Sequence, residues 1–254
     1  VSFTEKWLGL PPVVWEPQRT IIHLTRNHNI NWLRDFLDAL AKHNFNNLLL
    51  ITGDPLKEVR LKMVLAEDAL QRKDSAADEV RLKNSVELLK FIHAEAPGLN
   101  LGAAHNPFMK REVAQKHLMR KVEAGAQFLV TQPVSYYDEC WTVMAEFDQF
   151  CRENQLNLPV ILGVFNYAVP VGKDGYKEEA FAKRYKFWKK LFGFVPAGVR
   201  EDYDRGLNGI EILARSINKL IRMRYFHFDI MNAEKNGWSV LQNHQRLTHE
   251  LDRI

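Results

Sequence analysis

The stretch NNLLLITGDP (46–55) is an apolar run of strand length that stops at a glycine, a carboxylate and a proline. Such a run, bounded by Gly and Pro, is typical of a strand buried on both faces, as in a parallel sheet. Asp54 would then stand at the carboxyl end of the strand, where α/β proteins bind ligands. Asp followed by Pro is also typical of a helix start, with Asp54 as the N-cap. This stretch alone leaves both interpretations open.

Short apolar runs of the same kind recur along the chain and alternate with longer amphipathic segments. Apolar residues at helical spacing mark the segments 32–40, 86–92 and 113–122. This alternation predicts right-handed βαβ units and a parallel sheet, that is, an α/β fold. The further runs are RTIIHLT (19–25), LNLGAAH (99–105), AQFLVTQ (126–132), LPVILGVF (158–165) and RYFHFDIMN (224–232).

VSFT (1–4) is a seventh strand candidate, which leaves the chain one strand short of an eight-stranded barrel. Three alternatives follow: the first strand lies outside the chain shown, the barrel is incomplete, or the sheet is open. We expect a single (β/α) barrel domain over 1–254, because barrels of this size form one domain. Irregular insertions are expected near 57–90 and 166–198, both facing the ligand side.

Composition narrows the classes of function. The chain has 254 residues and a net charge of +4, and its lysines and arginines are interspersed with acidic residues. This mild, dispersed positive charge favours a small anionic ligand over nucleic acid. Cys140 and Cys151 are too few for a disulfide framework and lack zinc spacing, so we predict no metal site and a cytoplasmic location. Neither a membrane span nor a secretory signal is recognisable. Rossmann, P-loop, serine-elbow and HExxH motifs are absent.

Polar residues close each predicted strand, and in a barrel these strand ends converge on one mouth. A single histidine at such a place is most often structural. Convergence of several polar groups instead predicts a binding site. The set comprises His23, Thr25, Thr52, Gly53, Asp54, His105, Asn106, Gln132, Asn166, Asp229 and Asn232.

The chain resembles the methylenetetrahydrofolate reductase family over most of 19–232. RKVEAGAQFLVTQP (120–133) is the most specific piece of the resemblance. The other pieces, in the order and at about the spacing of the family, are HLTRN (23–27), NNLLLITGDP (46–55), GAAHNP (102–107), PVILGVF (159–165), LNGIEILARSINKLI (207–221) and FHFDIMN (226–232).

The resemblance implies a (β/α)8 TIM barrel that binds FAD and reduces 5,10-methylenetetrahydrofolate to 5-methyltetrahydrofolate. NADH, NADPH or an electron-donating protein would supply the electrons, and we expect a homo-oligomer without nucleic-acid or membrane partners. Asp54 would be a catalytic carboxylate that stabilises the cation formed when the methylenefolate opens to an iminium, and Gln132, with Asp229 and Asn232 of the last strand, would bind the folate. The FAD contacts would be His23, Thr52, Gly53, Asp54, Ala104, His105, Arg120, Lys121 and Ala126.

Four positions depart from the family pattern. The glutamate of the family's first strand has no equivalent, since Glu16 lies too close to the run 19–25. Asp229 occupies the position of the family's usual tyrosine, Ala233 that of an arginine and Asn166 that of a proline. The rival hypotheses are therefore a relative that uses another one-carbon carrier or a partner's electrons, and a non-catalytic barrel that regulates or scaffolds a partner.

Overall fold

The computed structural model describes residues 16–52, 82–167, 171–172, 175–176, 178–223 and 227–231. Gly53, Asp54 and Asn232 lie outside these residues, as do the strand expected at 1–4 and most of the insertion expected near 57–90. The chain divides into two compact units. The first comprises Val1–Ala104 and Met119–Phe128, and the second His105–Leu118 and Leu129–Ile254.

All six apolar runs of the sequence form strands, and each lies within its predicted bounds. Hydrogen bonding gives the strand order β1-β2-β3-β4-β5-β8. The pairings of β1 with β2, β2 with β3, β4 with β5 and β5 with β8 are parallel, which confirms the α/β class. The strands are β1 (Ile21–Thr25), β2 (Asn47–Ile51), β3 (Asn100–His105), β4 (Phe128–Thr131), β5 (Val160–Phe165) and β8 (Phe228–Met231).

The three helical segments expected from periodicity are also confirmed. They fall within α2 (Ile30–Lys42), α3 (Ser85–Glu95) and α4 (Arg111–Glu123). The remaining described elements are the 3-10 turn η1 (Pro17–Arg19), the helices α5 (Asp138–Glu153), α6 (Glu178–Phe192), α7 (Gly198–Asp204) and α8 (Gly209–Arg222), and the antiparallel pair β6 (Val171–Gly172) and β7 (Gly175–Tyr176).

The first unit is built around β2, whose central three residues are buried as expected for a strand covered on both faces. Asn29 caps α2 by accepting a hydrogen bond from the Trp32 N–H at 2.8 Å. Gly102 is required by packing, since a Cβ there would lie 2.2 Å from the Phe128 ring. The core consists of leucines and isoleucines of α2, β2, α3 and β3, including Leu33, Leu40, Leu48, Leu50, Leu88, Leu89, Ile92 and Leu101.

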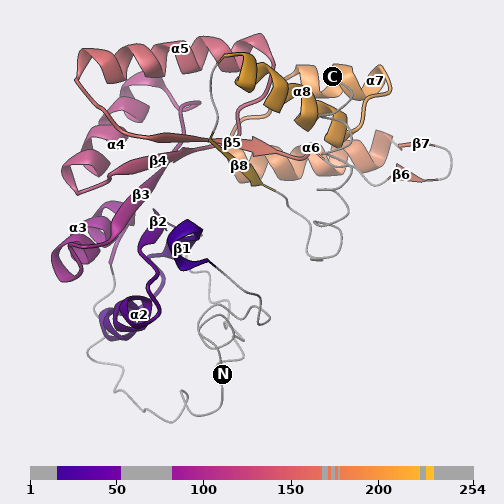
Figure 1. Ribbon diagram of the computed structural model, residues 1–254. Helices are drawn as coiled ribbons and strands as arrows, with labels where there is room; N and C mark the ends of the chain where they lie inside the picture. Colours follow the sequence, from indigo (N-terminus) through magenta and orange to yellow (C-terminus); the bar gives the residue numbers. More distant parts are fainter. Residues whose placement is uncertain are drawn as a thin grey trace. The chain divides into compact units, whose positions relative to one another are not determined.

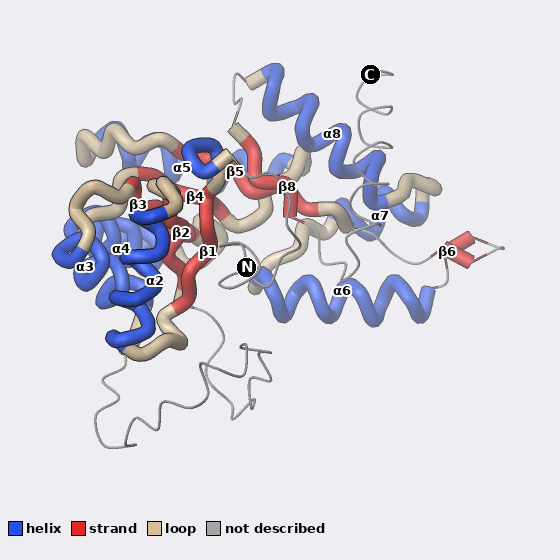
Figure 2. The backbone as a smooth tube through the Cα atoms, turned by 60° about the horizontal axis from the view of Figure 1, so that its bottom comes forward, coloured by secondary structure: helices blue, strands red, loops and turns tan. Residues whose placement is uncertain are grey.

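The second unit has helices on both sides of β5 and β8. Figures 1 and 2 show α5 and α8 on one side of these strands and α6 on the other. A capping box at Asn208 and Glu211 begins α8. The inner face of α6 packs with Phe165 and Tyr167 at the end of β5, through Phe181, Trp188 and Phe192. Within the stretch 166–198, α6 therefore covers the carboxyl end of β5.

No helix within the described residues is both long enough and apolar enough to cross a membrane.

Candidate functional site

In the first unit, polar groups gather at the carboxyl ends of β1 and β2. The Arg26 Nε donates to the Thr52 carbonyl at 3.1 Å, and the Thr52 hydroxyl donates to the Ser85 hydroxyl at 3.2 Å. His23 is exposed and lies on the face of β1 opposite the buried Ile22 and Leu24. These contacts hold the ends of two neighbouring strands together and leave the His23 imidazole accessible to a ligand.

Lys121 is a partly buried cation in the same unit. Its ammonium donates to the Ala104 carbonyl on β3, the one hydrogen-bond partner it has within the described residues. Burial lowers the pKa of Lys121, and no acid there compensates for the loss of water. The neighbouring Arg120 is exposed, and Ala126 is buried just before β4. The structure thus brings two of the predicted flavin contacts, Lys121 and Ala104, together.

These residues fit the chemistry of a dinucleotide such as FAD. A partly buried ammonium without a carboxylate neighbour is costly, and the pyrophosphate of a bound ligand would supply the missing negative charge. Arg120 forms no ion pair with a described residue, so its guanidinium is available to an anion as well. Within the described residues, no group of three or more His, Cys, Asp or Glu side chains could hold a metal ion.

In the second unit, two predicted folate contacts lie on or just after the strands that flank β5. Asp229 of β8 pairs with Gly163 of β5. Gln132 directly follows β4, and the Val134 N–H beyond it donates to the carbonyl of the same Gly163 at 2.8 Å. Gln132, Gly163 and Asp229 thus form a row across three neighbouring strands, about 10 Å across, or two strand spacings.

Two buried acceptors beside this row have no hydrogen-bond partner among the described residues. They are Gln132 Oε1 at the end of β4 and Asn166 Oδ1 directly after β5. Hydrogen bonds hold the backbone nearby. The Gln132 N–H donates to the His105 carbonyl at 2.8 Å, and the Gly163 N–H donates to the Thr131 hydroxyl at 3.0 Å. Buried acceptors normally have donors, so the free acceptor of Gln132 fits a ligand that carries N–H groups.

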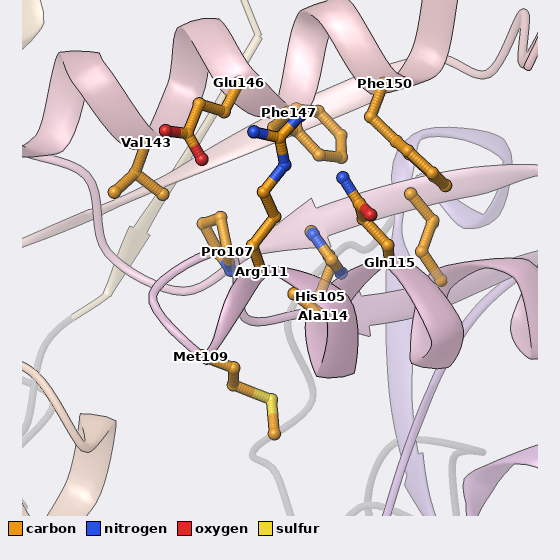
Figure 3. Close-up of a pocket in the computed structure, with 11 residues that line it drawn as sticks. His105, Pro107, Met109, Arg111, Ala114, Gln115, Val143, Glu146, Phe147 and Phe150 are labelled. Carbon is orange, nitrogen blue, oxygen red and sulfur yellow. The ribbon is translucent and has the colours of Figure 1, made fainter. Parts of the chain in front are cut away.

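His105 has a different environment from the one expected of a flavin contact. Its side chain is only 3% exposed, and its ring lies 5.0 Å from the Phe147 ring of α5, between centroids. Figure 3 shows the imidazole below α5 and next to α4, in the wall of a cavity between those helices. The backbone of His105 supports Gln132, whereas its ring belongs to the helix layer. A flavin contact for this ring remains a prediction.

A buried carboxylate in the second unit has no equivalent among the predicted site residues. Asp202 of α7 is 3% exposed and accepts hydrogen bonds from the hydroxyls of Tyr137, at 2.7 Å, and of Tyr136. Burial raises the pKa of Asp202, against the opposing effect of Arg215 and Arg205. Because 65 residues separate Asp202 from Tyr137, no local motif could have revealed the cluster. It joins the loop before α5 to α7.

Comparison with known proteins agrees with this architecture. A solved structure with a similar fold is that of an uncharacterized protein from Clostridium thermocellum that binds two copies of 5-methyl-5,6,7,8-tetrahydrofolic acid. The two chains share 13% identity and a TM-score of 0.50, over 92% of this chain and 95% of the other. No curated protein shows significant similarity. The family model for methylenetetrahydrofolate reductase matches residues 18–245. Because this match covers most of the length of the chain, the chain belongs to the methylenetetrahydrofolate reductase family.

Proposed function

We propose that the chain binds a reduced folate across Gln132, Gly163 and Asp229, and that with FAD it reduces 5,10-methylenetetrahydrofolate to 5-methyltetrahydrofolate. The observation that carries the proposal is the row itself, in which an amide and a carboxylate lie on either side of Gly163 and the buried Gln132 Oε1 has no partner among the described residues. The folate bound by the protein from Clostridium thermocellum supports the same class of ligand. We propose also that the strands belong to a (β/α)8 barrel.

A pterin ring suits this row chemically. Its flat ring needs an uncrowded surface, which a glycine between two side chains provides. The 2-amino and N3–H groups of a pterin are donors, and a carboxylate such as Asp229 accepts from both. The amide of Gln132 can accept through the buried Oε1 and donate to a ring carbonyl or nitrogen. Asn232 lies next along the chain after β8 and is assigned to the same ligand.

FAD would supply hydride transfer, while the chain would bind it, orient it and exclude water. We propose that Arg120 and Lys121 bind its phosphates, and that His23, Thr52, Gly53, Asp54, Ala104, His105 and Ala126 complete the contacts. NADH, NADPH or a partner protein would provide the electrons. The partly buried ammonium of Lys121, which has no acidic neighbour among the described residues, supports the phosphate assignment.

Replacing Gln132 by Met tests the folate site. Met has a similar length but cannot accept or donate as an amide does, so we expect 5-methyltetrahydrofolate to bind about tenfold more weakly, the effect of one hydrogen bond. Isothermal titration calorimetry measures the affinity. Gln149→Met on the exposed surface of α5 is the matched control and should leave it unchanged. Equal affinities for both variants and the parent would remove Gln132 from the site.

Replacing Arg120 or Lys121 by Ala tests the flavin site. Each change removes a charged donor to phosphate worth about 1.5–3 kcal/mol, so we expect FAD affinity to fall by about one to two decades. Retention of yellow colour after dilution, measured by absorbance, reports the loss. Lys116→Ala, an exposed cation of α4, should behave like the parent. Flavin retention by both test variants would mean that the two cations belong to an ordinary solvated helix face.

The colour of the purified protein separates the proposed enzyme from its rivals. A yellow protein that NADH or NADPH bleaches, and whose colour 5,10-methylenetetrahydrofolate restores, is the expected result. Colour that neither nicotinamide bleaches would favour a partner protein as the electron donor. A colourless protein that still binds 5-methyltetrahydrofolate and takes up no added FAD would favour a non-catalytic folate-binding relative.

A further inference from the structure

A second polar site lies in the second unit, in a cavity of about 80 Å3 between α4 and α5. Figure 3 shows Arg111 and Gln115 reaching from α4 toward α5, while Glu146 and Phe147 reach back from α5. These residues, with Leu118 of α4, line the cavity. The helices on either side of it thus contribute opposite charges to one opening.

The charged groups of this cavity are not engaged elsewhere. Within the described part of the chain, the side chains of Arg111, Gln115 and Glu146 take part in no ion pair and no hydrogen bond. Other side chains of α5 are satisfied locally, as in the 2.7 Å hydrogen bond from Gln149 to Glu153. A cation, an amide and an acid that face one cavity without partners are therefore available to a ligand with complementary charges.

The floor of the cavity is apolar. Leu118, Phe147 and Ala114 are buried there, with exposures of 0%, 7% and 6%. A cavity of roughly 150 Å3 lined by such residues admits benzene, so this one, of about half that volume, has room for about three carbon atoms, the branched end of an aliphatic side chain. The lining resembles an amphipathic binding site, with an apolar floor below two opposite charges.

We propose that this cavity binds an aliphatic α-amino acid. The carboxylate would meet the Arg111 guanidinium, whose planar fork suits it, and the ammonium would meet Glu146, with Gln115 as an additional polar contact. The aliphatic side chain would lie on Leu118 and Phe147. A simple anion would leave Glu146 unmatched, and a simple cation would leave Arg111 unmatched, so a zwitterion fits best. The proposal does not depend on folate or flavin binding.

Leucine and its two singly charged analogues test the proposal on the unmodified protein. The probes are L-leucine, 3-methylbutylamine, which lacks the carboxylate, and 4-methylpentanoate, which lacks the ammonium. We expect L-leucine to bind, with each analogue at least about tenfold weaker because one charged contact is lost. Calorimetry at ligand concentrations up to about 10 mM covers the millimolar range. No binding of leucine, or an analogue that binds as well as leucine, would overturn the proposal.

Variants then assign the two charges. Arg111→Gln should remove the advantage of leucine over the amine, whereas Glu146→Gln should remove its advantage over the acid. Lys116→Gln and Glu112→Gln, exposed on α4 outside the cavity lining, are the matched controls and should bind leucine like the parent. If both cavity variants bind leucine with the affinity of the parent, leucine does not bind in this cavity and the proposal is wrong.

Filling the cavity gives a separate test. Ala114→Leu keeps both charges but occupies the space above Leu118, so we expect leucine binding to be lost. Circular dichroism and the affinity for 5-methyltetrahydrofolate show whether each variant remains folded. Leucine affinity equal to that of the parent in a folded Ala114→Leu protein would contradict the proposal, whatever the folate result.

Discussion

Replacing Trp188 by Ala is expected to lower the free energy of unfolding by about 3–5 kcal/mol, the usual cost of deleting a large buried aromatic side chain. Trp188 is 1% exposed and makes edge-to-face contacts with Tyr167, Phe165 and Phe181, whose ring centroids lie at 5.2, 6.2 and 6.1 Å. The residue joins α6 to the carboxyl end of β5. Its loss would leave a cavity at the centre of this aromatic cluster.

The measurement is urea unfolding followed by far-UV circular dichroism, because the substitution itself removes a fluorophore. Phe187→Ala is the matched control, since this neighbouring aromatic side chain of α6 is 44% exposed. We expect its effect to stay within about 0.5 kcal/mol. If both variants lose equal stability, α6 is not held by its aromatic inner face.

The same cluster links stability to the folate proposal. Phe165 lies two residues beyond Gly163 and therefore on the same face of the sheet as Asp229, which pairs with Gly163. The helix that packs on Phe165 thus borders the proposed pterin surface in the second unit. We therefore expect the Trp188 variant to lose folate affinity in parallel with stability.

The strands could be predicted from sequence because each is a short buried apolar run that ends in turn residues. In β2, the run of three leucines is buried on both faces, as its composition requires. The helices were equally readable, since their apolar residues recur on one face. Both signals are local, and therefore neither needs knowledge of the tertiary structure.

The arrangement of the site could be predicted only in part. Gln132 and Asp229 were both candidates, but their alignment across Gly163 depends on strand register, which no local pattern specifies. His105 was also a candidate, yet its ring packs against Phe147 of α5, a contact that depends on how helix and strand meet. Likewise, nothing in the sequence distinguishes Arg111 and Glu146 from ordinary charged surface residues. They line one cavity only because α4 and α5 pack side by side.

Asp54 has two predicted duties that a single conservative substitution can separate. As an N-cap it would need only a side-chain oxygen, which Asn supplies about as well as Asp. As the catalytic carboxylate of the proposed reaction it would need its negative charge, to stabilise the cation that forms when 5,10-methylenetetrahydrofolate opens to an iminium. Asp54→Asn therefore preserves the first duty and abolishes the second.

We expect Asp54→Asn to slow the conversion of 5,10-methylenetetrahydrofolate by a factor corresponding to about 2–4 kcal/mol, the effect of one preorganised electrostatic group. Oxidation of the nicotinamide does not involve the folate iminium, so its rate should change much less. Stopped-flow measurement of the two half-reactions separately, with thermal melts of each protein, provides the test. Asp38→Asn, an exposed acid of α2, should leave both rates unchanged. An unchanged folate half-reaction in Asp54→Asn would leave this carboxylate with the helix-capping role alone, because the charge, the only property that the substitution removes, would then have no part in the chemistry.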